Sequence, residues 1–167
     1  PVIDAGFQVA LMAPTELLSE QHAAQFATWF SPLGISVGWL TGSMKAQPRR
    51  TILEQIANGS CQMVIGTHAL FQTDIVFHRL GLAIIDEQHR FGVAQRLLLR
   101  EKGKDLTPHQ LIMTATPIPR TLAMTHFADL DVSVIDALPP GRTPVDTRLL
   151  SQTRAAEITN RLDAQFN

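Results

Sequence analysis

The sequence predicts an α/β protein with a mostly parallel β-sheet that helices cover on both faces. Short apolar runs alternate with segments of helical periodicity, which is typical of repeated strand-helix-strand units with right-handed crossovers. The run at residues 80–85 is apolar without interruption, as expected of a strand buried on both faces. Several predicted strands end in a threonine-containing or acidic turn. One edge of the sheet should therefore collect these polar groups, because parallel strands end at the same edge.

The composition is that of an ordinary globular protein of 167 residues, with room for one domain and part of a second. Lys and Arg number 14 against 15 Asp and Glu, so the net charge of −1 does not indicate a polyanionic partner. The single cysteine, Cys61, excludes an internal disulfide, and we expect it to be a buried, inert thiol. No apolar run approaches membrane-spanning length, so we expect a soluble, cytoplasmic protein.

The first predicted strand, residues 8–13, leads through the turn at residues 14–16 into a helix. Pro32 and Gly34 end this helix. Its apolar face recurs every four residues and consists of Leu18, His22, Phe26 and Phe30. Because His22 lies on this face, we expect a packed histidine rather than a catalytic one.

Two more strand and helix pairs follow. A strand at residues 35–40 ends in the polar turn 41–43, and a helix at residues 48–57 stops at an Asn-Gly pair. The next strand, residues 63–65, ends in the turn 66–68. Residues 69–79 show no periodicity that predicts an element. The remaining predicted elements are strands at residues 80–85, 111–113 and 132–135, and helices near residues 93–101 and 119–127.

The amino-acid composition changes after residue 137. Residues 138–145 contain three prolines and a glycine, which suit a stiff linker and cannot join the interior of a sheet. We therefore expect a first domain over residues 1–137 and the start of a second over residues 146–167, with one strand and one helix. Both ends read as interrupted, so we expect the chain to be a piece of a longer protein.

The adjacent carboxylates Asp86 and Glu87 end the central strand. In nucleotide hydrolases such an Asp holds Mg²⁺ and a neighbouring Glu orients or deprotonates the attacking water. On spacing alone, a buried strand running into a solvated turn explains them equally well. The phosphate-binding pattern G-x-x-x-x-G-K-[ST] does not occur in these 167 residues.

The other polar turns suit a phosphate backbone, because glycines allow close approach and exposed amides attract anions. The turns at residues 14–16, 41–43 and 66–68 would follow a nucleic-acid strand without reading its bases. Each is weak evidence by itself, since any loop uses threonine and glycine. The hydroxyls of Thr114 and Thr116 would relay the state of the nucleotide, although Thr116 is equally suited to cap the next helix.

Four of these stretches resemble motifs of superfamily-two helicases. They are Ala13-Pro14-Thr15-Glu16-Leu17-Leu18 for motif Ia, Ile65-Gly66-Thr67-His68 for motif Ib, Asp86-Glu87-Gln88-His89 for motif II and Thr114-Ala115-Thr116 for motif III. The extensions at residues 89–93, 116–122 and 138–144 are similar to the RecG family of ATP-dependent DNA helicases. The resemblance covers nearly the whole chain.

The resemblance implies a RecA-like P-loop NTPase domain, the first motor domain of a helicase that uses ATP and Mg²⁺. Its implied partner is branched double-stranded DNA, such as forks and Holliday junctions, in fork reversal, recombination and repair by a monomeric bacterial enzyme associated with the nucleoid. Asp86 is the implied Mg²⁺ ligand and Glu87 the catalytic base. The implied coupling residues are Gln88, His89, Thr114, Ala115 and Thr116. The implied nucleic-acid contacts are Pro14, Thr15, Glu16, Thr41, Gly42, Gly66, Thr67, His68 and Arg120, and for Arg120 an exposed, solvated side chain is an equal alternative.

By the same mapping, motif I and its strand precede Pro1. In such domains this strand lies between the motif III strand and the last strand of the sheet. We therefore expect residues 111–114 and 132–135 to lack their shared partner, with a gap, an unusual pairing or exposed apolar edges. Without the phosphate loop, we expect the isolated chain not to hydrolyse ATP.

Three alternatives differ in class. A DNA- or protein-binding module without catalysis is compatible with the missing phosphate loop. A translocase like the transcription-repair coupling factor shares several of the same stretches, but typically has Glu where this chain has Gln88. A phospho-acceptor receiver domain also places an Asp at a strand end, yet it needs further acids after its first strand, where this chain has residues 14–16.

Overall fold

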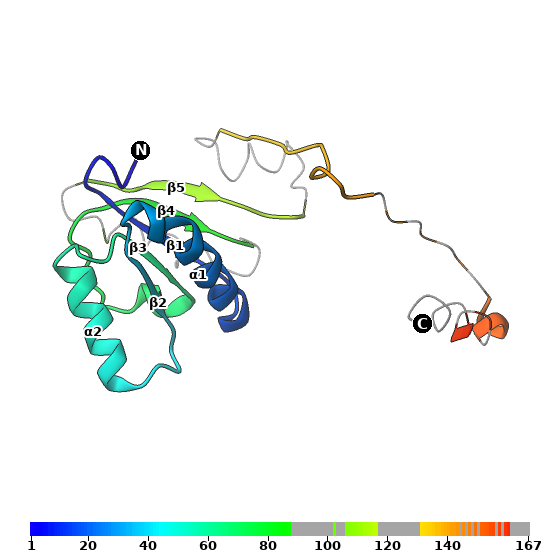
Figure 1. The fold of residues 1–167 in the computed structure, drawn as a ribbon, viewed down its shortest axis with the longest axis horizontal. Coiled ribbons are helices and arrows are strands. Elements are labelled where there is room, and N and C mark those ends of the chain that lie inside the picture. The colour runs from blue at the N-terminus through cyan, green and yellow to red at the C-terminus, as the bar shows by residue number, and fades with distance from the viewer. Residues whose placement is uncertain are drawn as a thin grey trace. The chain divides into compact units, whose positions relative to one another are not determined.

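The computed structural model describes residues 1–87, residue 102, residues 106–116 and 131–143, and single residues or short runs between residues 145 and 160. The chain divides into two compact units, Pro1–Pro119 and Arg120–Asn167. The first unit contains a β-sheet with α helices against it (Figure 1). In the second unit, the described residues include the 3-10 helix η4 (Gln152–Arg154), and the described residues at 155, 157, 159 and 160 are α-helical. Within the described residues, no helix has the length and hydropathy needed to cross a membrane.

The sheet has five strands, and every neighbouring pair is parallel. The strands are β1 (Gln8–Met12), β2 (Val37–Leu40), β3 (Met63–Gly66), β4 (Leu80–Ile85) and β5 (His109–Ile112). Their order is β2-β3-β1-β4-β5, so β1 lies between β3 and β4. This confirms the predicted parallel α/β fold, and it brings the carboxyl ends of all five strands to one edge.

The two α helices begin and end where local chemistry allows. In α1 (Glu16–Phe30), the Thr15 side chain caps the first turn by accepting a hydrogen bond from the Leu18 amide at 3.2 Å. The 3-10 turn η1 (Ser31–Leu33) and Gly34, with a φ of 71°, end this helix. The second helix, α2 (Ala46–Ala57), begins two residues before the predicted start.

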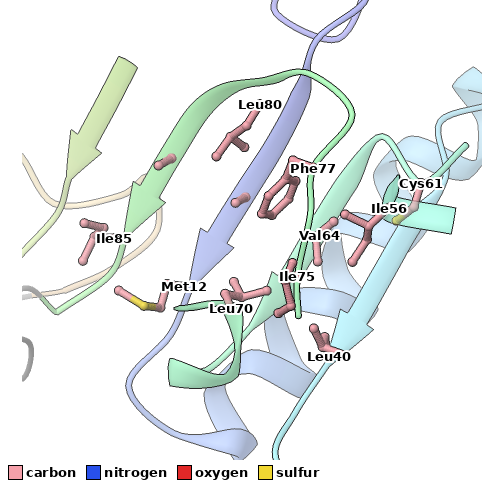
Figure 2. Packing of buried hydrophobic residues seen from close by; sticks show 12 residues of the cluster. Met12, Leu40, Ile56, Cys61, Val64, Leu70, Ile75, Phe77, Leu80 and Ile85 are labelled. Carbon is pink, nitrogen blue, oxygen red and sulfur yellow. The ribbon is translucent and has the colours of Figure 1, made fainter. Parts of the chain in front are cut away.

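Successive β1 residues face opposite sides of the sheet, which gives two separate cores. Val9 and Leu11 pack in one cluster with Phe26 and Phe30 of α1. The opposite face of β1 packs in a second cluster with Ile56 of α2, and Figure 2 shows part of this cluster. Helices therefore cover both faces of the sheet, as the sequence predicts.

Segment 72–79, for which periodicity predicted no element, is part of the second core. It follows the 3-10 turn η2 (His68–Phe71) and has no helix or strand of its own before β4. Ile75 and Phe77 are nonetheless 2% and 1% exposed and lie beside Leu70 and Val64 (Figure 2). The segment buries these side chains because it runs across one face of the sheet. Helical and strand periods predict burial only within regular elements, so they do not predict burial in this irregular segment.

The predicted strand at residues 132–135 is wrong. These residues have no regular structure, and Val134 and Ile135 are 73% and 93% exposed. A strand needs a hydrogen-bonded neighbour, and no described strand pairs with the outer edge of β5, whose Leu111 is 48% exposed. Exposed apolar side chains on both segments are one of the three outcomes expected for a missing shared strand. The helices predicted near residues 93–101 and 119–127 lie outside the described residues.

Candidate functional site

The acidic pair lies at the carboxyl end of β4, where neighbouring strands fix the backbone. The Asp86 amide donates to the Met12 carbonyl oxygen at 2.9 Å, and the Met113 amide donates to the Ile85 carbonyl oxygen at 2.9 Å. The Asp86 side chain is 21% exposed. A small ligand at the strand ends can therefore reach a carboxylate whose backbone is held from both sides.

Glu87 changes the direction of the chain directly after Asp86. Its φ is 53°, in the left-handed region that residues other than glycine rarely adopt. Such a conformation costs on the order of 1 kcal/mol and occurs at functional sites more often than elsewhere. The local strain thus coincides with the residue that the sequence marks as a catalytic base. Gln88 and His89 lie outside the described residues.

His22 binds Asp86, which the sequence did not predict. The two atoms His22 Nε2 and Asp86 Oδ2 are 3.1 Å apart, and the His22 side chain is 30% exposed. Because an ionised carboxylate only accepts, the imidazole donates through Nε2. The sequence predicted a packed histidine, and the structure adds this polar contact with Asp86. The reason is the sheet order, since α1 follows β1 and β1 lies beside β4.

The turns after β1 and β2 are joined by hydrogen bonds. Ser43 donates to the Glu16 carboxylate through its hydroxyl at 2.8 Å and through its amide at 3.4 Å. The Thr41 hydroxyl lies 3.2 Å from the Ser43 hydroxyl. Behind this pair, Trp39 Nε1 donates to the Ser19 hydroxyl at 2.9 Å, and that hydroxyl donates to the Glu16 carbonyl oxygen. The start of α1 and the turn 41–43 therefore form one connected unit.

The turn after β3 lies beside this unit. A side-chain carbon added at Gly42 would be 4.0 Å from His68 Nε2, so the two turns approach each other. His68 is exposed, whereas Gly66 is buried and Thr67 is 2% exposed. The Thr67 hydroxyl has no hydrogen-bond partner among the described residues.

Of the predicted nucleic-acid contacts, the side chains of two residues are thus hidden. Thr41 is 1% exposed and Thr67 2%, so their hydroxyls do not face solvent in this structure. Glu16, Gly42 and His68 are exposed, while Pro14 and Thr15 are partly exposed. Sequence reasoning assigned the turn that contains Ser43 to nucleic-acid contact, and the pairing of Ser43 with Glu16 had no local signal. Arg120 lies outside the described residues.

The predicted coupling turn follows β5. The Thr114 hydroxyl accepts from the Thr116 amide at 3.2 Å and lies 2.9 Å from the Thr116 hydroxyl. Thr114, Ala115 and Thr116 are all exposed. The two threonines therefore bind each other at the outer end of the same sheet edge, and the helix that Thr116 would cap lies outside the described residues.

Two groups away from the acidic pair have altered pKa values. Burial raises the pKa of the Cys61 thiol to about 11, against smaller opposing contributions from hydrogen bonds with Gly38 and Met63. Burial lowers the pKa of Lys102, and the charge of Asp74 opposes this shift. Lys102 Nζ donates to the carbonyl oxygens of Gln72 and Ile75 at 2.7 and 2.8 Å. The Cys61 result agrees with the predicted inert thiol.

The donor set suits a cation that a nucleotide brings with it. No group of three or more His, Cys, Asp or Glu among the described residues forms a metal cage. Mg²⁺ commonly binds to one or two carboxylates and completes its shell with water and substrate phosphates. The carboxylates of Asp86 and Glu87 are oxygen ligands of this kind, so the residues present fit Mg²⁺ bound together with a phosphate group.

Comparisons with known proteins give a consistent result. The family model of the DEAD/DEAH box helicases matches residues 2–125. The chain is 64% identical over 163 residues to the ATP-dependent DNA helicase RecG of Pasteurella multocida (strain Pm70), covering 96% of this chain and 24% of that protein. It is 64% identical over 159 residues to RecG of Escherichia coli (strain K12), covering 94% of this chain and 23% of that protein.

A solved structure of RecG bound to a three-way DNA junction is also similar. The TM-score is 0.77 at 44% sequence identity, over 94% of this chain and 21% of that one. The chain therefore spans about a quarter of the length of the relatives that it matches. The residues that the family model matches include all five strands of the sheet and the acidic pair. The chain belongs to the DEAD/DEAH box helicase family.

Proposed function

We propose that this chain is the nucleotide-hydrolysing part of the first motor domain of an ATP-dependent DNA helicase or translocase of the RecG type. The observation that carries the proposal is the acidic pair Asp86 and Glu87 at the carboxyl end of β4, with the turns after β1, β2 and β3 along the same edge. The similarity to RecG over nearly the whole chain supports the assignment. In this proposal the protein acts on branched double-stranded DNA in the bacterial cytoplasm, in fork reversal, recombination and repair.

Asp86 and Glu87 have separate roles in the proposed reaction. Asp86 holds Mg²⁺ together with the nucleotide phosphates. Bound Mg²⁺ neutralises the negative charge of the phosphates that are cleaved. Glu87 orients and deprotonates the attacking water. Its backbone φ of 53° turns the chain away from the direction of β4 at this residue. Gln88 and His89 couple this chemistry to DNA.

The proposed DNA surface consists of three turns from strands that are neighbours in the sheet. Exposed Gly42, Ser43 and His68 face solvent, and backbone amides in such turns suit phosphate oxygens. Glu16 is negatively charged, so its role there is to hold Ser43 rather than to bind phosphate. Thr41 and Thr67 shape the turns from within. Thr114, Ala115, Thr116 and Arg120 connect the nucleotide and DNA sides.

The domain organisation is part of the proposal. Residues 1–137 are the first motor domain, residues 138–145 the linker and residues 146–167 the start of the second motor domain. In this proposal, a further strand that carries the phosphate loop in the whole protein pairs with the outer edge of β5, next to which no described strand lies. The exposed Leu111 supports this, because an apolar side chain at the edge of the sheet needs a covering neighbour.

The test uses the full-length protein that contains this chain. Glu87→Gln should lower the kcat of DNA-stimulated ATP hydrolysis by at least 100-fold and leave nucleotide affinity nearly unchanged, because it removes only the base. Asp86→Asn should weaken Mg²⁺-dependent nucleotide binding as well. Gln25→Leu, an exposed position on α1, is the matched control. Full hydrolysis by Glu87→Gln would refute the assignment.

A binding module without catalysis is the second candidate for the chain by itself. The G-x-x-x-x-G-K-[ST] pattern, whose loop cradles the phosphates in P-loop hydrolases, does not occur in the 167 residues, and this favours the binding module. Fluorescence anisotropy with a labelled three-way junction at several salt concentrations measures this. A weak affinity with a shallow salt dependence, and no ATP hydrolysis, would support the module, because few phosphate contacts release few counterions.

A further inference from the structure

The contact between His22 and Asp86 joins a helix to the centre of the acidic site. His22 Nε2 lies 3.1 Å from Asp86 Oδ2, and 64 residues separate the two in the chain. Both side chains are less than one third exposed. The contact is therefore a tertiary feature of the site that neither residue's neighbours in sequence predict.

The imidazole occupies one oxygen of the Asp86 carboxylate. A carboxylate has two oxygens, and a hydrogen bond at Oδ2 restricts rotation of the group about its terminal torsion, which is otherwise soft. The other oxygen, Oδ1, then keeps a fixed direction for a cation. Side chains that hydrogen-bond to a metal ligand without binding the metal commonly set the orientation of that ligand.

The rest of α1 holds the imidazole in place. Ala23 and Phe26, one residue and one turn after His22, pack in the core cluster against the sheet with Leu11. The Thr15 cap and the Ser19 hydrogen bond with Trp39 fix the beginning of the same helix. His22 therefore projects from a helix that is anchored before and after it, which is what a positioning residue needs.

We propose that His22 is a positioning residue that orients the Asp86 carboxylate for Mg²⁺ in the nucleotide complex. This rests on the proposed function, since it takes Asp86 as the ligand of the nucleotide-bound cation. His22 itself does not touch the nucleotide or the cation. Its effect is on cation affinity at a given nucleotide occupancy.

The experiment measures cation binding directly, without turnover. The full-length protein that contains this chain is saturated with a non-hydrolysable ATP analogue, and Mn²⁺ binding is followed by electron paramagnetic resonance. His22→Leu keeps the bulk of the side chain and removes the donor, while His22→Gln keeps an amide N–H at a similar reach. Gln25→Leu on the same helix is the control for adding a leucine.

His22→Leu should weaken Mn²⁺ binding about tenfold, which is at the lower end of the effects of such second contacts. His22→Gln should recover most of this affinity, and Gln25→Leu should match the wild type. Affinity for the nucleotide without metal should not change in any variant. Thermal unfolding of each variant detects a loss of folding, and the His22→Gln comparison keeps the test valid if His22→Leu is unstable.

Three negative outcomes are distinguishable. If Asp86→Asn abolishes Mn²⁺ binding but His22→Leu and His22→Gln both bind Mn²⁺ like the wild type, the positioning role is refuted and the proposed function stands. If Asp86→Asn also binds Mn²⁺ like the wild type, Asp86 is not the ligand of the cation. This outcome refutes the proposed function, and the positioning role that rests on it. Equal losses in His22→Leu and His22→Gln would likewise refute the hydrogen bond as the cause.

Discussion

Replacing Gln8 with leucine should destabilise this chain more than any exposed substitution, although Gln8 lies at the opposite end of β1 from the acidic site. Gln8 is 3% exposed. Its amide nitrogen donates to the carbonyl oxygens of Ile56 and Cys61 at 2.9 and 2.7 Å. Its amide oxygen accepts from the backbone amides of His78 and Arg79 at 2.8 and 3.1 Å. One side chain thus satisfies four backbone groups in three segments.

The magnitude follows from what each backbone group loses. The Cys61 carbonyl oxygen is buried, and leaving it unsatisfied costs about 1–3 kcal/mol. The Ile56 carbonyl oxygen keeps a hydrogen bond from the Gly59 amide, so its loss is smaller, about 1 kcal/mol. The amides of His78 and Arg79 are partly buried and add about 1 kcal/mol together. The expected loss for Gln8→Leu is therefore about 3–5 kcal/mol.

Urea unfolding followed by tryptophan fluorescence measures this loss, since Trp39 lies in β2 of the same sheet. Gln8→Glu is informative beside Gln8→Leu, because it keeps the size of the side chain and places a carboxylate oxygen against the Ile56 and Cys61 carbonyl oxygens. Gln25→Leu is the control, with an expected change below about 0.5 kcal/mol. A change of less than about 1 kcal/mol for Gln8→Leu would refute the reasoning, because water would then replace the lost partners.

Three further predictions concern other parts of the first unit. Burial raises the pKa of Cys61 from 9.0 to about 11, so the folded state favours the protonated thiol. The free energy of unfolding should therefore be constant below about pH 9 and fall as the pH rises towards 11. We expect this fall to be about 2–3 kcal/mol larger in the wild type than in Cys61→Ala. Equal pH profiles of urea unfolding would contradict this. Gly66→Ala should cost about 1–3 kcal/mol or more, because its Cβ would overlap the Leu40 carbonyl oxygen on β2; unchanged thermal unfolding would contradict it. Glu16→Ala and Ser43→Ala should be non-additive, with a coupling of about 0.5–1 kcal/mol in a double-mutant cycle of urea unfolding, and additive losses would exclude the pairing as a stabilising contact.

The sequence by itself determined the layered parallel fold and the position of the acidic pair. Both follow from local patterns: the unbroken apolar run of β4 requires burial on two faces, and Asp86 and Glu87 directly follow it. The i+4 stripe of α1 also predicted that Phe26 and Phe30 reach the core. Helix and strand periods are properties of adjacent residues, so they are available without any knowledge of the neighbours in space.

Only the tertiary structure decided which groups meet at the edge of the sheet. The order β3-β1-β4 brings His22 to Asp86, and the proximity of the β1 and β2 turns brings Glu16 to Ser43. Burial of the Thr67 hydroxyl likewise depends on the packing around it. The sequence period of a helix or strand does not encode strand order, because a parallel sheet is assembled from segments far apart in the chain. For this reason His22 reads as a core residue along the chain and as a partner of Asp86 in space.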